Sequence, residues 1–302
     1  MNLQFLADGL LMGAMIGLGA IGVTLTYSIL RFANFAHGDF IAWGAYFALL
    51  FSGAIGIAAG HEIAPFGPFT FGWPLLLAGV GAMAMTGLLA LLLERLVFKV
   101  LRAHGNAIVI VIASFGASMV LRSVLEFFFT SEPHYFSRDI QIAMPLGFGV
   151  RMTADQMAML ALTLVLVVAL HVLMTRTQIG RAMRAVSENP MLARVMGVDV
   201  DQVVRATWMI GGALACAAGI MVGVTVQIRP HMGFDLLLPL FSAAILGGIG
   251  SVPGAVLGGL IVGLSEALAV QFIGAEYRAA VAFMLLIAVL LVRPTGLFGV
   301  RP

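Results

Sequence analysis

Charged side chains are scarce in this sequence. Its 302 residues include 16 basic and 14 acidic side chains, whereas 61% of the residues are hydrophobic and the mean hydropathy is +1.08. A soluble domain carries about 25% charged residues, and one soluble core has no room for so large an apolar excess. The composition therefore excludes an ordinary soluble protein and predicts a polytopic membrane protein.

Cysteine and lysine are almost absent. Cys216 is the only cysteine, which excludes an internal disulfide and a cysteine-rich metal cluster. Lys99 is the only lysine and follows Phe98, so the chain lacks the Gly-Lys-Ser/Thr of an ATP-binding P-loop. The six histidines are scattered without metalloprotease spacing, and the small excess of arginine is no nucleic-acid footprint. We expect no cofactor, no metal, no nucleic-acid partner and no enzymatic site.

Glycine is abundant, but its patterns indicate helix packing. Residues 17–22 read GLGAIG and match the dinucleotide-binding pattern, which has meaning only between a strand and a helix. Here the pattern lies inside an apolar stretch of membrane length. Gly9, Gly13 and Gly17 form two overlapping G-x-x-x-G steps, which favour close approach of two membrane helices.

Apolar runs of membrane-spanning length follow one another along the chain. A membrane helix needs about 20 mostly apolar residues. Eight runs meet this need: 9–30, 40–59, 73–97, 107–129, 156–174, 206–228, 253–273 and 277–292. A further run, 234–250, fits either a short span or a re-entrant segment. The predicted fold is all-α, with about 8–9 transmembrane helices in a single domain over residues 1–302.

The basic residues indicate the orientation in the membrane. With nine crossings and an outer N-terminus, eleven basic residues fall on the inner side and five on the outer side. The inner set is Arg31, Arg95, Lys99, Arg102, Arg176, Arg181, Arg184, Arg194, Arg205, Arg293 and Arg301, and the outer set is Arg122, Arg138, Arg151, Arg229 and Arg278. Basic connections face the cytoplasm, so residues 176–205 are predicted to be cytoplasmic and 130–152 extracytoplasmic.

Polar residues at membrane depth are expensive, and they therefore identify candidate functional positions. Asn34, His37 and Asp39 join the first two spans, either as a short cytoplasmic turn or as a broken helix that lines a pathway. Arg122 and Glu126 have i,i+4 spacing and are expected to neutralise each other on one helix face.

Two further candidates lie near the C-terminal end. Glu266 has no charged neighbour within a helical turn, so it must face protein or water. Ser251, Pro253 and Gly254 stand in the densest glycine cluster, where Pro253 predicts a helix break. Such a break lines a cavity in some transporters. An ordinary turn between helices is the equal alternative.

The segment 176–205 holds eight of the charged residues: Arg176, Arg181, Arg184, Glu188, Arg194, Asp199, Asp201 and Arg205. Apolar residues recur in it at helical spacing. Asn189 followed by Pro190 predicts a helix start, and Gly197 predicts its end. We therefore predict a short amphipathic helix over 190–196. It either lies on the lipid surface or docks in a groove of a soluble partner.

Three longer stretches carry a resemblance to a known family. NFAHGDFIAWGAY (34–46), RAVSENPMLARVMGVDVDQV (184–203) and AAILGGIGSVPGAVLGGLIVGLSE (243–266) occur in the order seen in the permeases of branched-chain amino acid ABC importers. The chain resembles this LivH/LivM family from about residue 9 onward, and is closer to LivH in length. The resemblance implies one permease domain of the inner (cytoplasmic) membrane.

The resemblance also implies partners and a cargo. They are a homologous second permease, two ATP-binding cassette ATPase subunits that hydrolyse ATP, and an extracytoplasmic substrate-binding protein. The cargo implied is leucine, isoleucine, valine or a related small amino acid. Related permeases serve urea, amides and aromatic acids. A secondary transporter or channel for a small solute is the alternative function, because it too is polytopic.

The resemblance implies that the amphipathic helix predicted over 190–196 is a coupling helix, which docks in a groove of the ATPase. ABC importer loops often carry Glu-Ala-Ala-x-x-x-Gly, of which Ala193 and Gly197 are kept, whereas Met191 and Leu192 replace the first two residues. The residues predicted to couple to the ATPase are Pro190, Ala193, Arg194, Met196, Gly197 and Asp199. The residues predicted to line the pathway or a helix break are Asn34, His37, Asp39, Ser251, Pro253, Gly254 and Glu266.

Overall fold

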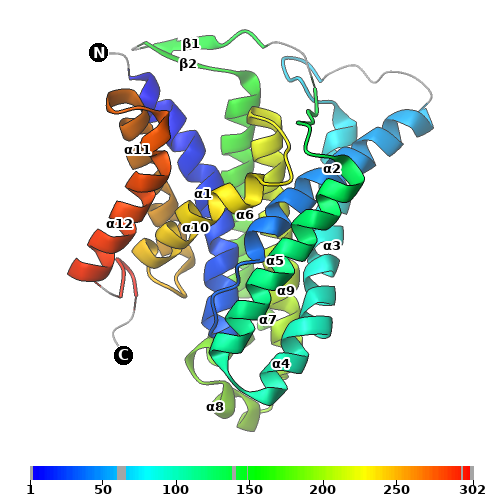
Figure 1. Ribbon diagram of the computed structural model, residues 1–302, viewed down its shortest axis with the longest axis vertical. Coiled ribbons are helices and arrows are strands. Elements are labelled where there is room, and N and C mark those ends of the chain that lie inside the picture. Colours follow the sequence, from blue (N-terminus) through cyan, green and yellow to red (C-terminus); the bar gives the residue numbers. More distant parts are fainter. Residues whose placement is uncertain (1–2, 60–65, 138–140, 148, 294, 300–302) are drawn as a thin grey trace.

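The computed structural model is a bundle of long α-helices (Figure 1). It describes residues 3–59, 66–137, 141–147, 149–293 and 295–299. In chain order its helices are α1 (Gln4–Leu30), α2 (His37–Ala59), α3 (Trp73–Leu93), the π-helix η1 (Glu94–Phe98), α4 (Lys99–His104), α5 (Ala107–Phe129), α6 (Ala154–Arg176), α7 (Gln178–Glu188), α8 (Pro190–Val195), α9 (Val200–Thr225), α10 (Met232–Gly247), α11 (Val252–Phe272), the 3₁₀-helix η2 (Ala275–Tyr277) and α12 (Arg278–Val292). The predicted all-α class is confirmed.

The predicted spans correspond to the long helices. Eight helical segments of the described residues are long and apolar enough to cross a membrane, and each overlaps one predicted run. α3, η1 and α4 form one continuous segment of this kind, Trp73–Arg102. The ninth run corresponds to α10, which has only 16 residues and contains Pro239. α9 begins at Val200, so the last residues of the predicted loop 176–205 belong to a membrane helix.

The helices connect at two opposite ends of the bundle. The N-terminus and an antiparallel hairpin of β1 (Met144–Gly147) and β2 (Val150–Met152) lie at one end, and α8 lies at the other (Figure 1). The C-terminal end of α12 points toward the α8 end. This arrangement agrees with alternating crossings, but which end faces the cytoplasm stays a prediction. Arg138 and Arg301, which entered that prediction, lie outside the described residues.

α1 and α11 pack closely because glycines face each other along both helices. A methyl group added at Gly263 would collide with the backbone of Gly13, and one added at Gly259 would collide with that of Gly17. One added at Gly13 would lie 2.8 Å from the Cα atom of Leu260. The close packing predicted from the G-x-x-x-G steps is therefore confirmed, and α1 is held in the interior.

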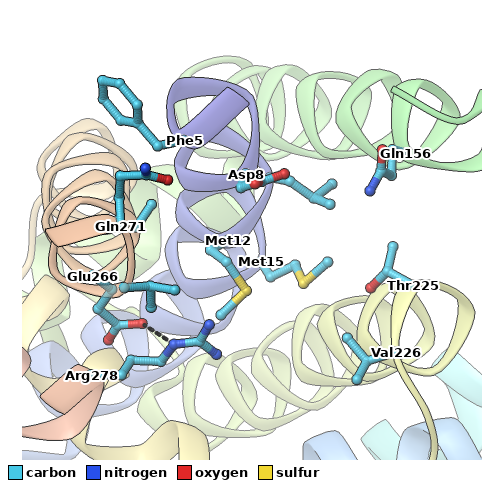
Figure 2. Close-up of a pocket in the computed structure, with 13 residues that line it drawn as sticks. Phe5, Asp8, Met12, Met15, Gln156, Thr225, Val226, Glu266, Gln271 and Arg278 are labelled. Carbon is cyan, nitrogen blue, oxygen red and sulfur yellow. Dashed lines mark ion pairs between the residues drawn. The ribbon is translucent and has the colours of Figure 1, made fainter. Parts of the chain in front are cut away.

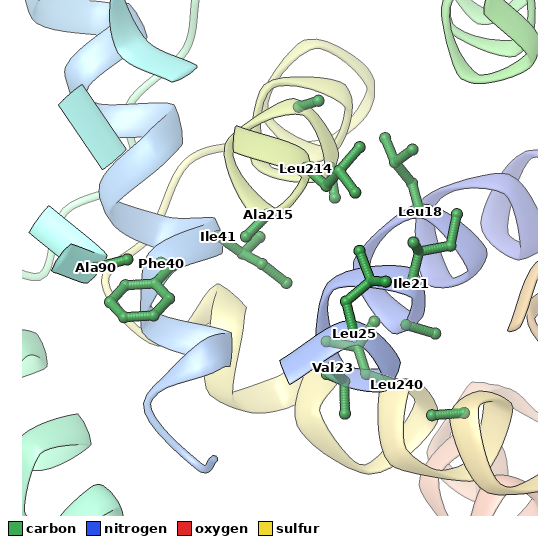
Figure 3. Close-up of a cluster of buried hydrophobic side chains, with 14 of the residues drawn as sticks. Leu18, Ile21, Val23, Leu25, Phe40, Ile41, Ala90, Leu214, Ala215 and Leu240 are labelled. Carbon is green, nitrogen blue, oxygen red and sulfur yellow. The ribbon is translucent and has the colours of Figure 1, made fainter. Parts of the chain in front are cut away.

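The apolar core gathers around α1. Figure 3 shows Leu18 and Ile21 of α1 beside side chains from α2, α9 and α10. Ile21, Ile41 of α2 and Leu240 of α10 have no exposed surface. Helices that are apolar on all sides need such neighbours or lipid. α1 therefore stands at the centre of the packed core.

α2 and α10 both begin inside the bundle. The chain reaches them through the non-helical segments 31–36 and 226–231. Gly38 and Gly233, in the first turns of the two helices, are in backbone contact, and a methyl group on either would collide with the other residue. The two helix starts therefore meet, near the centre of the view in Figure 1. The interpretation of residues 34–39 as a cytoplasmic turn is wrong, because Asn34, His37 and Asp39 are buried.

Candidate functional site

The charged segment after α6 folds into two short helices. Thr177 caps α7 by accepting a hydrogen bond from the backbone nitrogen of Gly180 at 3.1 Å. Met183 and Val186, spaced along one face of α7, are buried against the bundle. Asn189 caps α8 by accepting from the backbone nitrogens of Met191 and Leu192 at 3.0 Å. The amphipathic helix predicted over 190–196 is confirmed as α8.

α8 presents an apolar face to the outside of the bundle. The exposed fractions are 81% for Val195, 76% for Met196, 72% for Met191 and 59% for Leu192. Ala193 faces inward and is only 4% exposed. Ala193 therefore offers little surface to a partner, and its predicted role in coupling to the ATPase stays a prediction. A small residue is needed there because α8 lies against α7 and α9.

The other predicted coupling residues have local roles that the sequence patterns did not separate. Pro190 occupies the first turn of α8, where its missing N–H costs no helical hydrogen bond. Gly197 follows α8 with a φ of +84°, the left-handed region that favours glycine. Asp199 caps α9 through the backbone nitrogen of Gln202 at 3.0 Å and lies 3.8 Å from Arg205. Arg194 is exposed.

Two arginines fasten this segment to the membrane helices. Arg31, which follows α1 in the left-handed backbone region, donates a hydrogen bond from its guanidinium to the carbonyl oxygen of Ser187. Arg184 of α7 donates to the carbonyl oxygen of Met174 in α6. These two hydrogen bonds join α7 to the ends of α1 and α6, and α8 packs against α7.

The predicted interior residues Asn34, His37 and Asp39 lie at the start of α2. Asn34 accepts a hydrogen bond from the backbone nitrogen of Ala36 at 3.1 Å, and its amide nitrogen has no partner among the described residues. A ring nitrogen of His37 lies 3.1 Å from the carbonyl oxygen of Gly19 in α1. Asp39 accepts a hydrogen bond from the hydroxyl of Ser118 in α5. These contacts hold the start of α2 between α1 and α5.

Arg122 and Glu126 do not neutralise each other as the sequence predicts. The Nε atom of Arg122 lies 3.4 Å from a carboxylate oxygen of Asp39, and its guanidinium carbon lies 4.3 Å from the ring centre of Phe234. Glu126 pairs with His231, whose Nδ1 atom lies 3.2 Å from its carboxylate. His231 is one of the six scattered histidines, to which the sequence patterns assign no site. The spacing of residues within α5 could not reveal the pair of Glu126 and His231, because His231 comes from a distant part of the chain.

Ser251 ends the turn between α10 and α11, and Pro253 and Gly254 lie in the first turn of α11. Ser251 caps α11 by accepting from the backbone nitrogen of Gly254 at 3.1 Å, and Pro253 stands in its first turn. Gly254 and Gly247 are in backbone contact, so neither has room for a side chain. The predicted helix break is confirmed: of its two alternatives, the structure shows an ordinary turn between helices. A pathway role for these three residues stays a prediction.

Glu266 lies at the wall of a cavity between α1, α6, α9, α11 and α12. The cavity has a volume of about 260 Å³ and is lined by Asp8, Met12, Gln156, Gln271 and Arg278 among others. Figure 2 shows Arg278 pointing toward Glu266, with 3.9 Å between Nε and a carboxylate oxygen. Glu266 is 1% exposed, and neither carboxylate oxygen has a hydrogen-bond partner among the described residues. The sequence identified Glu266 as a candidate position, but it did not identify Arg278 as its partner.

These features define a multi-pass α-helical membrane protein that carries a short helix with an exposed apolar face at one end. Residues 5–290 match the model of the family described as the permease component of branched-chain amino acid transport systems, so the chain belongs to that family. It is a transport subunit of the inner membrane and not an enzyme.

Individual relatives cover almost the whole chain. The high-affinity branched-chain amino acid transport system permease protein LivH of Escherichia coli K12 is 34% identical over 99% of this chain and 96% of its own length. The permease protein BraD of a system with the same description, from Pseudomonas aeruginosa, is also 34% identical, with the same coverage. Among solved structures, PsaBC of Streptococcus pneumoniae in complex with Fab aligns with a TM-score of 0.46 at 15% identity, over 97% of this chain and 95% of its own.

Proposed function

We propose that the chain is one of two permease subunits in an ATP-driven importer of branched-chain or related small amino acids. In this assembly it forms half of the translocation pathway. A homologous permease forms the other half, two ATPase subunits hydrolyse ATP, and an extracytoplasmic protein delivers the solute. The family and the names of the full-length relatives support this proposal.

The observation that carries the proposal is the exposed apolar face of α8. Met191, Leu192, Val195 and Met196 form a patch on a helix of two turns, outside the bundle. A short helix with such a face is typical of segments that dock in a groove of a partner protein. The caps at Asn189 and Gly197 and the anchoring of α7 hold it in one conformation. Little conformational entropy is lost when a partner binds a pre-ordered helix.

The opposite end of the bundle suits a delivering protein. The segment between α5 and α6 carries the β1–β2 hairpin, which lies at the end of the bundle opposite α8 (Figure 1). Gln4 ties this hairpin to α1, because its side-chain amide donates to the carbonyl oxygen of Arg151 at 3.0 Å. A binding protein that lands on the hairpin therefore contacts the segment that leads into α6, at whose other end α7 begins.

The proposed cargo rests on the relatives and on charge. Both relatives named above are described as branched-chain amino acid permeases. In the described residues, each arginine whose side chain faces the bundle interior lies beside a carboxylate, as Arg122 does with Asp39 and Arg102 with Glu94. Such paired arginines do not form a strongly cationic lining that would retain a phosphorylated solute.

Reconstitution tests the cargo and the dependence on ATP together. The chain is co-expressed with the ATPase, second permease and binding protein encoded with it, purified and placed in liposomes. We expect leucine uptake that requires ATP and the binding protein. Uptake of urea or an aromatic acid without leucine would refute the cargo. Leucine uptake without ATPase subunits would instead support a secondary transporter or channel.

A pair of substitutions tests the docking helix in the same preparation. Val195→Glu places a charge in the centre of the exposed apolar face, and we expect the ATPase subunits no longer to co-purify. Arg181→Glu, on the exposed side of α7, changes charge nearby without touching that face and serves as the control. Retention of the ATPase by Val195→Glu would show that α8 does not dock on it.

A further inference from the structure

Four ionisable side chains from three separate elements meet beside the start of α10. Asp39 belongs to α2, Arg122 and Glu126 belong to α5, and His231 precedes α10. They form two linked pairs, Asp39 with Arg122 at 3.4 Å and Glu126 with His231 at 3.2 Å. Phe234, one turn into α10, covers the guanidinium of Arg122. We call these five residues the α5–α10 cluster.

The two pairs differ in exposure. The Asp39 side chain is fully buried and that of Arg122 is 14% exposed, whereas Glu126 is 33% and His231 is 55% exposed. Ser118 also donates a hydrogen bond to Asp39, and lies 3.3 Å from a guanidinium nitrogen of Arg122. The inner pair is therefore held on several sides. The outer pair, Glu126 and His231, is open on one side.

The cluster lies within the layer that the helices span. Arg122 is seven residues before the end of α5 at Phe129, which is about 10 Å at the rise of an α-helix, and Glu126 is about 5 Å from that end. The start of α2, which carries Asp39, lies against Gly19 and Gly22 in the middle of α1. The cluster thus reaches from the interior toward the end of the bundle that holds the hairpin.

Contact between lipid and the exposed side of the α5–α10 cluster is energetically unfavourable. Ionisable side chains within a membrane almost always face water or protein, because their transfer into hydrocarbon costs several kcal/mol. In Figure 1 the start of α10 lies near the centre of the front face, flanked by α5 and α1. The open side therefore faces either an aqueous pathway or another permease subunit.

The charges of the cluster select what can bind there. With His231 neutral, Asp39, Arg122 and Glu126 contribute −1, +1 and −1, which leaves a net charge of −1. Arg122 is occupied by the buried Asp39, so the accessible charge is the carboxylate of Glu126. Phe234 packs on the guanidinium of Arg122, one helical turn before Glu126 in α5, and its half-exposed ring suits an aliphatic group or a cation. An ammonium group beside an apolar side chain matches both.

We propose that Glu126, His231 and Phe234 form a contact site for the ammonium end of an amino acid inside the pathway, with Asp39 and Arg122 as positioning residues. This proposal rests on the proposed function, because it assumes an amino-acid cargo and a pathway between two permeases. His231 occupies the Glu126 carboxylate in the empty protein and yields it to the ammonium group. His231 and Phe234 are 55% and 41% exposed, so a ligand held there keeps part of its hydration, which suits transient contact during transport.

Access to the site is tested first, on the full complex in liposomes. The only native cysteine, Cys216, is buried, so single added cysteines can be followed. We expect a charged, water-soluble thiol reagent to modify Phe234→Cys and to leave Met284→Cys in the middle of α12 unmodified, although Met284 is the more exposed, at 59% against 41%. An unreactive Phe234→Cys would place the cluster against lipid or in a dry subunit interface and overturn the proposal.

The role of the carboxylate is tested by Glu126→Gln against Glu276→Gln, a carboxylate on the exposed η2 turn. We expect kcat/KM for leucine uptake to fall about tenfold or more in Glu126→Gln, because a charged hydrogen-bond partner is lost. Glu126→Asp should recover part of it. ATP hydrolysis stimulated by the loaded binding protein should persist in all three, which a general structural defect would not allow.

The outcomes separate the two proposals. Equal uptake by Glu126→Gln and Glu276→Gln would overturn the ammonium site while the importer function stands. Loss of stimulated ATP hydrolysis together with uptake in Glu126→Gln would assign Glu126 a structural role and also overturn it. A wild-type complex that imports no aliphatic amino acid would refute the cargo, and with it the ligand of this site, before any variant is compared.

Discussion

The guanidinium of Arg31 donates a hydrogen bond to the carbonyl oxygen of Ser187, and so joins the end of α1 to α7. Arg31 also begins the segment 31–36, which leads directly to the buried start of α2. One residue thus connects the segment that carries α8 with the interior contacts of Asp39. We interpret this connection as a route by which events at α8 reach the pathway.

The backbone conformation of Arg31 and its bond to Ser187 lead to a prediction about stability and coupling. Its φ of +60° lies in the left-handed region, which costs an L-residue about 1 kcal/mol that glycine does not incur. We therefore expect Arg31→Gly to unfold at a higher temperature than Arg31→Ala, although both lose the bond to Ser187. Both should import less leucine per ATP hydrolysed than the wild type. A more stable Arg31→Ala would contradict the backbone argument.

Gly197 makes a prediction about α8. A β-branched residue is strained at a φ of +84°, whereas asparagine adopts this region readily. A Cβ atom added at this position would meet no atom within 4 Å beyond its chain neighbours, so the backbone conformation decides the effect. We expect Gly197→Val to abolish ATP-driven uptake while the permease stays in the membrane, and Gly197→Asn to keep most of the uptake. Equal transport by the two variants would show that the end of α8 tolerates another conformation.

Gly233 makes a prediction about the meeting point of α2 and α10. A methyl group there collides with the carbonyl of Gly38, and such overpacking costs about 1–3 kcal/mol. We expect Gly233→Ala to lower the unfolding temperature in detergent. Gly53→Ala, in the same helix as Gly38 but with no atom within 4 Å of the added methyl group, should be neutral or stabilising. A Gly233→Ala variant as stable as Gly53→Ala would mean that the two helix starts do not touch.

The orientation of the bundle gives a fourth prediction. We expect a cysteine at Glu188 to be labelled by an impermeant reagent only from the cytoplasmic side, and one at Glu132 only from the other side, since both positions are exposed. The wild-type chain is the control, because its Cys216 is buried. Labelling of Glu188→Cys in intact cells would reverse the topology derived from the arginines.

Several features of this protein could be predicted from short stretches of sequence. The length of each apolar run decided the membrane helices, because a spanning helix must satisfy its backbone within itself. Asn189, Pro190 and Gly197 decided the bounds of α8, because capping involves residues within one turn. Pro253 decided the end of the α10–α11 turn for the same reason. Each of these features depends on neighbours along the chain.

Only the tertiary structure decided which charged residues pair with each other and which side chains of the charged segment face inward. Arg122 and Glu126 have the spacing of an ion pair, yet each pairs with a residue of another element. Ala193 was grouped with the coupling residues by its motif, and only the packing of α8 on α7 and α9 shows that its side chain faces inward. A buried carboxylate such as Asp39 needs a partner more than an exposed one does, because burial removes its hydration. Which carboxylate is buried depends on where α2 begins, and the Gly38–Gly233 contact between distant segments sets that position.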